Sequence, residues 1–506
     1  MTRPPHASAV DTGQLFIGID LGTSSVKVIA LDLSGTVVGR ATAAYPISVP
    51  APGRAEQDPR HWWQATCTAL RTLLASPAVA GRLIAGVGVT GQMHGLVLVD
   101  RHGAPVRDAV IWPDQRATDD VRRLTQELGG DTIHQITGMP ASVGFSGPTL
   151  SWIRRQEPEV YARARHALLP KDHLRWRLTG DTHTDPTDAG GTLLFDLATG
   201  RWSQPLVAAC GVRSQLLPDV LASTTIAGTV TPEAAAATGL AAGTPVTVGA
   251  GDQATAATAL SLRQDLDTAL AVSSGGTVLQ YRAAWPHPHP PGVHRLLGAE
   301  GERLLMGATL SAGLAVHWLA QTLHGPDPDT EQVATLVSGA SAVPAGADGL
   351  LFLPYLSGER TPHLDPDARG GFLGLSREHT PAHLTRALLE GVAMSLRTCL
   401  ETVADAAHRP PWITVCGGGA HHPVWRQIIA DVIGTPLRLS PYDEQSAVGA
   451  ALLAARATGH TVTPAAPHLS ETVTPHTPEQ ARYARIYPVF QDAYRTTRDL
   501  LRRLPP

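Results

Sequence analysis

Two segments far apart in the sequence share one pattern, a strand, a glycine-containing turn and a second strand, and this repetition constrains the fold most. Apolar residues at 15–20 and 25–32 flank the turn Gly22–Ser25, and a third strand is predicted at 36–44. Residues 268–285 repeat the pattern without repeating the sequence. A single core rarely exceeds roughly 250–300 residues, and the chain has 506. The repetition therefore predicts two α/β domains with a cleft between them.

The other predicted elements follow from capping and periodicity. Asp58 as N-cap and Pro59 predict a helix that ends near Leu74. An apolar strand at 84–90 is followed by residues 96–100, which we expect to close a short hairpin with it. The later predictions are helices at 381–403, 423–434, 447–457 and 478–504 and strands at 412–416 and 437–440. We divide the chain into a disordered lead-in at 1–14, domains at 15–258 and 259–460, and a tail at 461–506 whose helix packs on the body.

Composition excludes several classes of protein. The formal net charge of −4 argues against nucleic-acid or membrane binding driven by bulk positive charge. No stretch of roughly 18 uninterrupted apolar residues is present, and the first residues contain no apolar signal core. The four cysteines are widely spaced without a CxxC pair, which fits a reducing compartment. We therefore expect a cytoplasmic enzyme that acts on small molecules.

Two of the turns have the composition of phosphate-binding loops. In Asp20–Ser25, Gly22 lets a phosphate approach the backbone, while N–H groups and the hydroxyls of Thr23 and Ser24 donate to it. Asp20 could hold Mg²⁺ through its waters. Ser273–Thr277, with Ser274 and Gly275 at its centre, is the matching turn of the second half. An ordinary hairpin turn remains the alternative for each.

Two further glycine-containing junctions are candidates for function. Gly417–Ala420 joins a strand to a helix, and we interpret Gly418, Gly419 and Ala420 as a flat backbone platform for a base or ribose, or else as a tight turn. The run Gly249–Gln253 precedes another helix. We expect the helix dipole to keep Asp252 ionised near neutral pH, as suits a base that accepts a hydroxyl proton. The alternative for Asp252 is a helix N-cap.

Two segments are candidates for sugar binding. The first is Met93-His94, which follows the strand at 84–90, and the second is Trp112–Arg116. Met93 can cover an apolar face of a sugar and His94 can bond its hydroxyl or carbonyl groups, although a lone histidine is more often structural. Asp114 and Arg116 could bind a polyol or form a surface ion pair. The histidines between 287 and 294 alternate with prolines, and we expect a solvated loop there rather than a metal site.

These residues together resemble the FGGY family of carbohydrate kinases, from about residue 15 to about residue 460. The segments that carry the resemblance are Ile17–Ser24, a first signature at Ser146, Pro148, Leu150, Trp152 and Ile153, Leu168–Asp172, Leu353–His363, and a second signature from Gly374-Leu375 through His383-Leu384 to Ala387–Glu390. Lys171, one of only two lysines, falls within them, which agrees with a role that an arginine would not fill.

The resemblance implies an actin/Hsp70-like ATPase fold with two RNase H-like domains flanking a central cleft that binds MgATP. It implies ATP-dependent phosphorylation of D-xylulose to D-xylulose 5-phosphate. Residues 15–258 would hold the sugar, the first phosphate loop and the catalytic residue, and residues 259–460 would bind the nucleotide. The implied roles are catalytic base for Asp252, Mg²⁺-side carboxylate for Asp20, sugar contacts for Met93, His94, Asp114 and Gln253, and ATP contacts for Gly22, Thr23, Ser24, Ser274, Gly275, Gly418, Gly419 and Ala420.

The sequence also departs from the family pattern. Thr149 stands where the first signature usually has lysine, Pro113 and Gln115 alter the Trp-x-Asp-x-Arg stretch, and Ser273-Ser274 replaces Gly-Thr. The first two departures bear on the choice of sugar and the third on ATP affinity. The alternatives are a family kinase for another ketose or polyol, such as ribulose or a sugar alcohol, and a non-catalytic actin-like nucleotide-binding module. We expect no nucleic-acid or membrane partner, and a homodimer is compatible with the sequence.

Overall fold

The computed structural model describes residues 13–404, 409–464 and 471–503, whose contacts divide them into two units. The first unit contains the described residues within 13–261, 296–302 and 444–464, and the second contains those within 262–295, 303–443 and 471–503. The predicted boundary between residues 258 and 259 stays a prediction. Most of the predicted lead-in and parts of the predicted tail lie outside the described residues.

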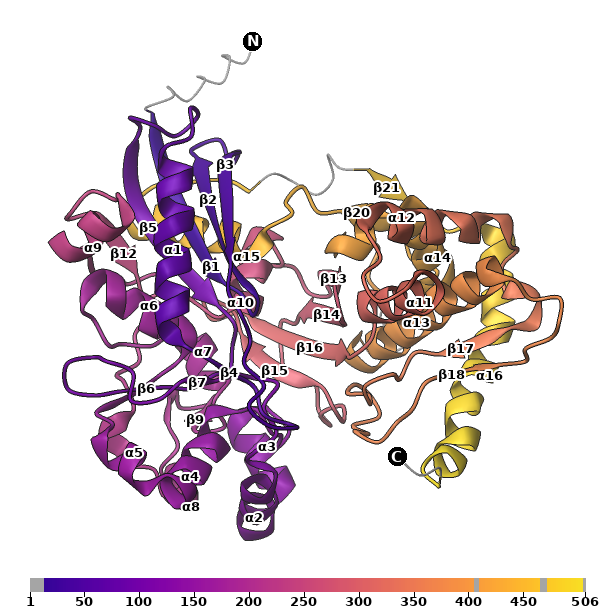
Figure 1. Cartoon of the computed structure of the whole chain (residues 1–506), viewed down its shortest axis with the longest axis horizontal. Helices are drawn as coiled ribbons and strands as arrows, with labels where there is room; N and C mark the ends of the chain where they lie inside the picture. Colours follow the sequence, from indigo (N-terminus) through magenta and orange to yellow (C-terminus); the bar gives the residue numbers. More distant parts are fainter. Residues whose placement is uncertain (1–12, 405–408, 465–470, 504–506) are drawn as a thin grey trace, which may run out of the picture. The chain divides into compact units, whose positions relative to one another are not determined.

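A mixed six-stranded sheet forms the centre of the first unit (Figure 1). Its order is β11 (Ile226–Thr229), β12 (Pro245–Thr247), β5 (Leu83–Gly91), β1 (Gln14–Leu21), β2 (Ser25–Asp32) and β3 (Val37–Ala44). Strands β1, β2 and β3 are antiparallel neighbours, whereas β5 is parallel to both β1 and β12. The predicted opening of three strands joined by turns is confirmed.

The second unit repeats this topology in a seven-stranded sheet. Its order is β15 (His294–Leu297), β16 (Arg303–Thr309), β14 (Gly276–Tyr281), β13 (Thr268–Val272), β19 (Ile413–Cys416), β20 (Leu437–Leu439) and β21 (Thr472–Val473). Strands β13, β14 and β16 are antiparallel neighbours, and β13, β19 and β20 run parallel. Both units therefore share a series of five neighbouring strands, three antiparallel and then two parallel: β3-β2-β1-β5-β12 in the first and β16-β14-β13-β19-β20 in the second. This agrees with the predicted duplication.

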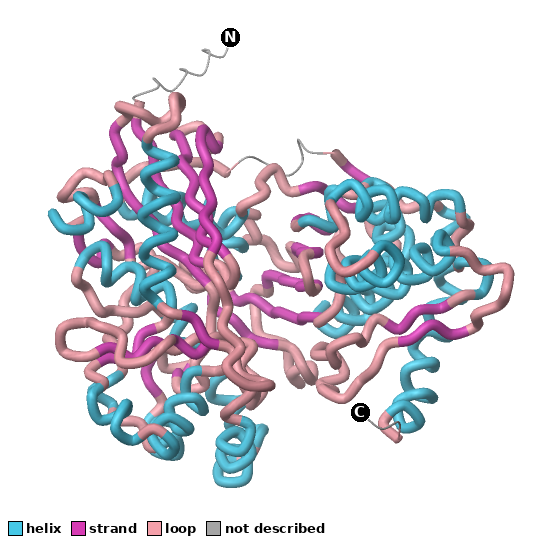
Figure 2. The backbone as a smooth tube through the Cα atoms, viewed as in Figure 1, coloured by secondary structure: helices cyan, strands magenta, loops and turns pink. Residues whose placement is uncertain are grey.

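The remaining elements are short strands and helices around the two sheets. In the first unit the helices are α1 (Pro59–Leu74), α2 (Thr118–Leu128), α3 (Gly130–Thr137), α4 (Ser146–Gln156), α5 (Pro158–Arg163), α6 (Pro170–Thr179), α7 (Pro186–Gly190), α8 (Gln204–Cys210), α9 (Pro232–Thr238), α10 (Asp252–Ala259) and α15 (Gln445–Ala457). In the second they are α11 (Gly313–His324), α12 (Thr330–Gly339), α13 (Pro381–Ala404), α14 (Pro423–Ile433) and α16 (Thr477–Leu501). Figure 2 shows these helices in cyan and the strands in magenta.

Two helices cover the sheet of the first unit. Helix α1 packs on β2 and β3 through Trp62, Leu70 and Leu73, and its N-cap Asp58 accepts a hydrogen bond from the N–H of Arg60, as predicted. Helix α15 packs on β1 and β5 and against α10. Glycine is required in these strands, because a Cβ on Gly18 would lie 1.8 Å from the carbonyl oxygen of Ala447. The backbone of α15 therefore approaches the sheet directly.

One predicted strand pairing is wrong. Strand β6 (Val97–Val99) does not form a hairpin with β5 but pairs with β8 (His166–Leu168). The reason is that β5 already has a parallel neighbour on each side, so its edges offer no free hydrogen-bonding groups to a returning strand. The chain leaves the sheet after β5, and His94 adopts a left-handed conformation with φ of 71°. The other short strand pairs are β4 (Glu56–Gln57) with β7 (Ala109–Val110), β9 (Phe195–Asp196) with β10 (Arg201–Trp202), and β17 (Leu351–Leu353) with β18 (Gly371–Leu373).

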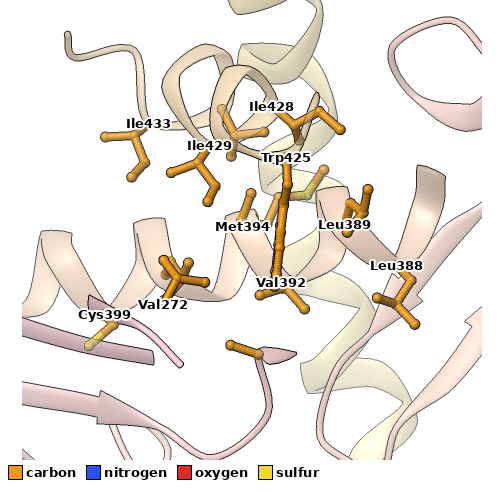
Figure 3. Packing of buried hydrophobic residues seen from close by; sticks show 14 of the residues in the cluster. Val272, Leu388, Leu389, Val392, Met394, Cys399, Trp425, Ile428, Ile429 and Ile433 are labelled. Atoms are coloured by element: carbon orange, nitrogen blue, oxygen red, sulfur yellow. The ribbon is translucent and has the colours of Figure 1, made fainter. Parts of the chain in front are cut away.

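The core of the second unit is built around helix α13. Figure 3 shows Trp425 pointing from α14 toward Val392 and Met394 of α13, with Ile428 and Ile429 beside it. Helix α16 adds Tyr483, Tyr487, Phe490 and Tyr494 to the same cluster. All four cysteines, Cys67, Cys210, Cys399 and Cys416, are buried and free. None of the helices within the described ranges combines the length and the apolar character needed to cross a membrane.

Candidate active site

The carboxyl ends of the parallel strands β5 and β12 bring together two of the predicted segments. Strand β5 leads into Met93 and His94, and β12 leads into Gly249–Asp252. Buried Met93 lies against Gly251, where a Cβ would approach the Met93 sulfur to 3.0 Å. Thr90 and Thr255 join β5 to helix α10 through a hydrogen bond of 2.9 Å between their hydroxyls. The predicted sugar contact Met93 therefore lies next to the predicted catalytic segment.

Asp252 is the first residue of helix α10, and the N-cap is Gly251. Gly251 therefore occupies the cap position, and the N-cap alternative for Asp252 is wrong. The pKa of Asp252 is raised to about 7, mainly by burial and also by the charge of Asp20, whereas hydrogen bonds from Gln253 act to lower it. Burial thus opposes the helix dipole, which we expected to keep Asp252 ionised near neutral pH. A pKa near 7 nevertheless suits a general base.

Asp20 is the second carboxyl group on this side of the sheet. It lies near the end of β1, directly opposite Lys27 on β2. Burial raises the pKa of Asp20 to about 6, a tendency that Lys27 opposes and Glu444 reinforces. Since Asp20 and Asp252 repel each other electrostatically, a positive charge between them would be stabilised.

The ring of His94 is held in place by the protein. Its Nδ1 lies 2.7 Å from the carbonyl oxygen of Gly191, and the ring packs on Phe145 with centroids 4.3 Å apart. Because a carbonyl oxygen can only accept, Nδ1 carries the proton, and Nε2 is the acceptor of the neutral ring. The structural role that was the alternative for His94 is thus present, and its contact with a sugar stays a prediction.

Asp114 is buried and already satisfied. Its carboxylate accepts hydrogen bonds from the N–H of Ala55 at 2.7 Å and from the guanidinium of Arg116 at 2.8 and 2.7 Å. The side chains of Asp114 and Arg116 are both only 1% exposed, so the alternative of a surface ion pair is wrong. Arg116 also contacts Glu56 and lies over the ring of Trp152. Asp114 therefore fixes the loop after β7, and its contact with a sugar stays a prediction.

The first predicted phosphate turn is held by its carbonyl groups. Tyr45 donates its hydroxyl to the carbonyl of Gly22 and its N–H to that of Ser24, and Gln57 donates to the carbonyl of Thr23 at 2.7 Å. The indole of Trp112 donates to the Thr23 hydroxyl at 3.0 Å. These bonds fix the conformation of the turn. Sequence reasoning missed Gln57 and Trp112, because their link to the turn is a long-range contact.

The second predicted phosphate turn is held in the same way, within the second unit. The N–H groups of Ala312 and Leu314 donate to the carbonyl of Ser274 at 2.8 and 3.0 Å. Gly275 fits only without a side chain, because a Cβ there would lie 2.5 Å from the carbonyl oxygen of Thr309. Ser273 and Ser274 are exposed, so the two departures from the family pattern place hydroxyl groups on the open side of the turn.

A pocket of about 600 Å³ connects this turn to the Gly417–Ala420 junction. Gly418 and Gly419 line it as part of a 3₁₀ turn at Gly418–His421, whereas Gly275 and Ala420 are not among its lining residues. A Cβ on Gly418 would meet nothing within 4 Å, so this glycine faces open space. The other lining residues are Ser273, Ser274, Gly313, Leu314, Val316, His317, Val333, His422 and Trp425. The volume lies within the roughly 300–1,000 Å³ of small-molecule sites.

Among the described residues, no group of three or more histidine, cysteine, aspartate or glutamate side chains could together hold a metal ion. His289 bonds the carbonyl of Val293 and His294 is a buried residue of β15.

Thr149, at the signature position that usually carries lysine, is buried in α4 and bonds the carbonyl of Phe145. It therefore does not reach the segments described above through its own side chain.

The chain is similar to a known protein family, to known sequences and to solved structures. Models of the N-terminal and C-terminal domains of the FGGY family of carbohydrate kinases match residues 15–259 and 271–458. The chain is 34% identical to the xylulose kinase of Bacillus subtilis (96% of this chain, 97% of the relative) and 36% identical to that of Escherichia coli K12 (97% and 98%). Its fold is similar to the structure of xylulose kinase from Rhodospirillum rubrum, with a TM-score of 0.86, 32% identity and coverage of 97% and 100%.

Proposed function

The chain belongs to the FGGY family of carbohydrate kinases, and from this premise we propose that it is a xylulose kinase, which transfers the γ-phosphate of ATP to D-xylulose. Two observations of different kind support the choice of sugar. Relatives named xylulose kinase match nearly the whole chain at 34–36% identity. The resemblance to the family also implies that the pair Met93-His94 stands where glycerol kinases carry Arg-Glu, which argues against glycerol.

The observation that carries the proposal is the packing of Met93 against Gly251, beside Asp252. It places an apolar surface suited to a carbon chain next to a carboxyl group whose pKa is about 7. A nucleotide-binding module that transfers nothing would need neither feature. Gln253, which bonds Asp252, would contact the sugar from the same turn of α10.

The proposed step is a direct displacement at phosphorus. Asp252 accepts the proton of the 5-hydroxyl of D-xylulose, and the hydroxyl oxygen forms a bond to the γ-phosphorus. The bond between that phosphorus and the β,γ-bridging oxygen breaks, and ADP leaves with the electron pair. Catalysis of phosphoryl transfer depends mostly on positioning and on electrostatic stabilisation.

ATP is the phosphoryl donor in this family. We assign its phosphates to the turns at Gly22–Ser24 and Ser274-Gly275, and its adenosine to the pocket beside Gly418, Gly419 and Ala420. The donor set fits Mg²⁺, because this ion is usually held by one or two carboxylates together with the phosphates, and Asp20 supplies an oxygen ligand or an acceptor for its waters. Bound Mg²⁺ neutralises charge that develops on the phosphate oxygens.

The substitution Asp252→Asn tests this proposal, because the amide keeps the shape of the side chain and loses the base. We expect turnover of D-xylulose with ATP to fall about 10²–10⁴-fold. The measurements are initial rates, thermal unfolding and binding of a non-hydrolysable ATP analogue, of which only the rate should change strongly. A variant that retains a tenth of the wild-type turnover would refute the role of Asp252.

Asp58→Asn is the matched control. Asp58 is the N-cap of α1 and bonds the backbone N–H of Arg60. Asparagine caps helices about as well as aspartate, so this variant should keep wild-type turnover. A comparable loss in both variants would show that the rate reports general damage to the fold.

A further inference from the structure

Behind the Asp252 loop lies a buried cluster of five charged side chains on α6 and the start of α7. The Nζ of Lys171 lies 2.6 Å from Asp172, 3.1 Å from Asp185 and 3.7 Å from Asp188. Arg175 pairs with Asp172 at 2.9 Å. All five side chains are fully buried. Burying several charges is costly and is not expected to stabilise a fold compared with apolar packing. We therefore look for a function of the cluster in its contacts with the loop that carries Asp252.

The charged groups of the cluster shift one another's pKa values. Burial would lower the pKa of Lys171, but the three carboxyl groups around it raise it, so Lys171 remains charged. Burial alone would raise the pKa of Asp172, yet Lys171 and Arg175 lower it. Burial raises the pKa of Asp188 well above its ordinary value, and Asp172, Asp185 and Asp252 raise it further.

The cluster contacts the segment that carries Asp252. Arg175 and Lys171 both donate to the carbonyl of Val248, at 2.9 and 3.4 Å. Thr187 of α7 connects the cluster to Gly251. Its hydroxyl accepts a hydrogen bond of 2.8 Å from the N–H of Gly251 and donates one of 2.6 Å to the carboxylate of Asp185. Lys171, Asp185 and Thr187 thus form a chain of contacts that ends one residue before Asp252.

The same short segment also holds His94. Gly191 follows α7, and its carbonyl lies 2.7 Å from Nδ1 of the imidazole. A side chain at Gly191 would lie 2.9 Å from that nitrogen, so the ring packs directly on the backbone. Residues 185–191 therefore contact both His94, which is predicted to bind the sugar, and the loop that leads into Asp252, the predicted base.

We propose that Thr187, held by Asp185 and Lys171, is a positioning residue that fixes the Gly249–Gly251 loop and thereby aligns Asp252 with the acceptor hydroxyl held near His94. This inference rests on the proposed function for the role of Asp252. Its geometry concerns Gly251 and Thr187 alone and can be tested without the reaction. A base must lie within hydrogen-bond reach of its proton, and small displacements of a catalytic group cost large factors in rate.

The test compares Thr187→Val with Thr187→Ser. Valine keeps the volume but leaves the N–H of Gly251 without its acceptor, whereas serine keeps the hydroxyl. We expect Thr187→Val to lower kcat for D-xylulose by about 10–100-fold with little change in KM for ATP, and Thr187→Ser to retain at least a third of wild-type kcat. Serine that is as impaired as valine, or valine with wild-type kcat, would overturn the proposal.

The matched control is Thr238→Val. Thr238 is also buried, donates to the carbonyl of Ala234 at 2.7 Å and accepts the N–H of Leu240 at 3.3 Å, but it lies at the end of α9. Both valine variants remove a buried hydroxyl that donates one hydrogen bond and accepts one from a backbone N–H. The bond to the Asp185 carboxylate is the stronger of the two donated bonds, so Thr187→Val should lose at least as much thermal stability as Thr238→Val. Only Thr187→Val should lower kcat, and an equal loss of kcat in Thr238→Val would contradict a positioning role.

Amide hydrogen exchange separates this inference from the proposed function. Overlapping peptides that resolve Gly251 should exchange faster in Thr187→Val than in wild type, and at the wild-type rate in Thr187→Ser and Thr238→Val. Unchanged exchange at Gly251 in Thr187→Val would overturn the proposal even if the rate fell. If wild type fails to phosphorylate D-xylulose, the proposed function fails, while the exchange result still decides whether Thr187 holds the loop.

Discussion

At the scale of single residues, the site depends on carboxyl groups whose environments differ. Burial is the main reason for the raised pKa values of Asp252 and Asp20; the charge of Asp20 adds to it for Asp252, and the charge of Glu444 adds to it for Asp20. Asp114, by contrast, accepts hydrogen bonds on both carboxylate oxygens, from the guanidinium of Arg116 and from the N–H of Ala55. One type of side chain thus has a pKa near neutral pH in one place, as suits the proposed base, and is a structural acceptor in another.

The pKa of Asp252 predicts the pH dependence of the reaction. Only the ionised carboxylate can accept the hydroxyl proton, so kcat/KM for D-xylulose should fall about tenfold per pH unit below a midpoint near 7. Initial rates across the pH range at saturating MgATP measure this limb. The side-chain hydrogen bond from Gln253 lowers the pKa of Asp252. Gln253→Ala removes this bond and keeps the backbone N–H, so it should move the limb to higher pH. A profile that is flat through neutral pH, or a limb that Gln253→Ala leaves in place, would contradict the assignment.

The identity of these residues could be predicted from the sequence, but their states could not. Gly249–Asp252 indicates a functional carboxylate after a strand, and Met93-His94 indicates a ligand contact at a strand end. The pKa of Asp252 depends on Asp20, which is distant in sequence. Likewise, the partners of Lys171 include Asp185 and Asp188, which only the tertiary fold brings to it. Asp185-Pro186 at the start of α7 reads as an ordinary helix start, so the sequence does not separate its two roles.

At the scale of elements, helix α15 positions helix α10 and therefore Asp252. Glycines on both sides allow this packing: a Cβ on Gly88 of β5 would lie 1.9 Å from the carbonyl of Ala450, and one on Gly449 would lie 1.9 Å from that of Thr255. Ser446 also donates to the carbonyl of Asp252 at 3.2 Å. The backbones of α10 and α15 are thus in direct contact beneath the predicted base.

Gly449→Ala should reverse the usual effect of alanine in a helix. An interior glycine is normally about 1 kcal/mol worse than alanine, but the new methyl group would clash with the backbone of α10. We expect unfolding to become easier by about 1–3 kcal/mol and kcat to fall, measured by denaturant titration and initial rates. Gly339→Ala in α12 is the control, because a Cβ there meets nothing within 4 Å. Equal or increased stability of Gly449→Ala would show that the helices can separate without cost.

Most elements could be predicted, since capping residues and apolar periodicity are local signals. The failure at residues 96–100 has a topological cause: pairing to β5 was excluded by strands β1 and β12, and β12 comes more than a hundred residues later in the sequence. Helix α15 packs in the first unit, although it follows strands of the second unit in the sequence. Local sequence patterns could not predict this packing either.

At the scale of the whole molecule, two units carry the same order of five strands and the same kind of turn between the first two strands. In each unit the carbonyl groups of that turn are held by the protein, by Tyr45 and Gln57 in one and by the start of α11 in the other. The repetition of geometry without repetition of sequence was the feature from which two domains were predicted. The cytoplasmic location and a homodimer stay predictions.

The preference for D-xylulose is the central claim, and its most direct test is the set of specificity constants for D-xylulose, ribulose, glycerol and arabinitol with ATP, in wild type and in His94→Ala. We expect wild type to prefer D-xylulose. Loss of a hydrogen-bond partner for a buried polar group costs about 1–3 kcal/mol, so His94→Ala should lower the constant for D-xylulose roughly 5- to 150-fold and leave the KM for ATP nearly unchanged. A wild-type preference for another of these acceptors, or an equal loss on all four in His94→Ala, would contradict the account.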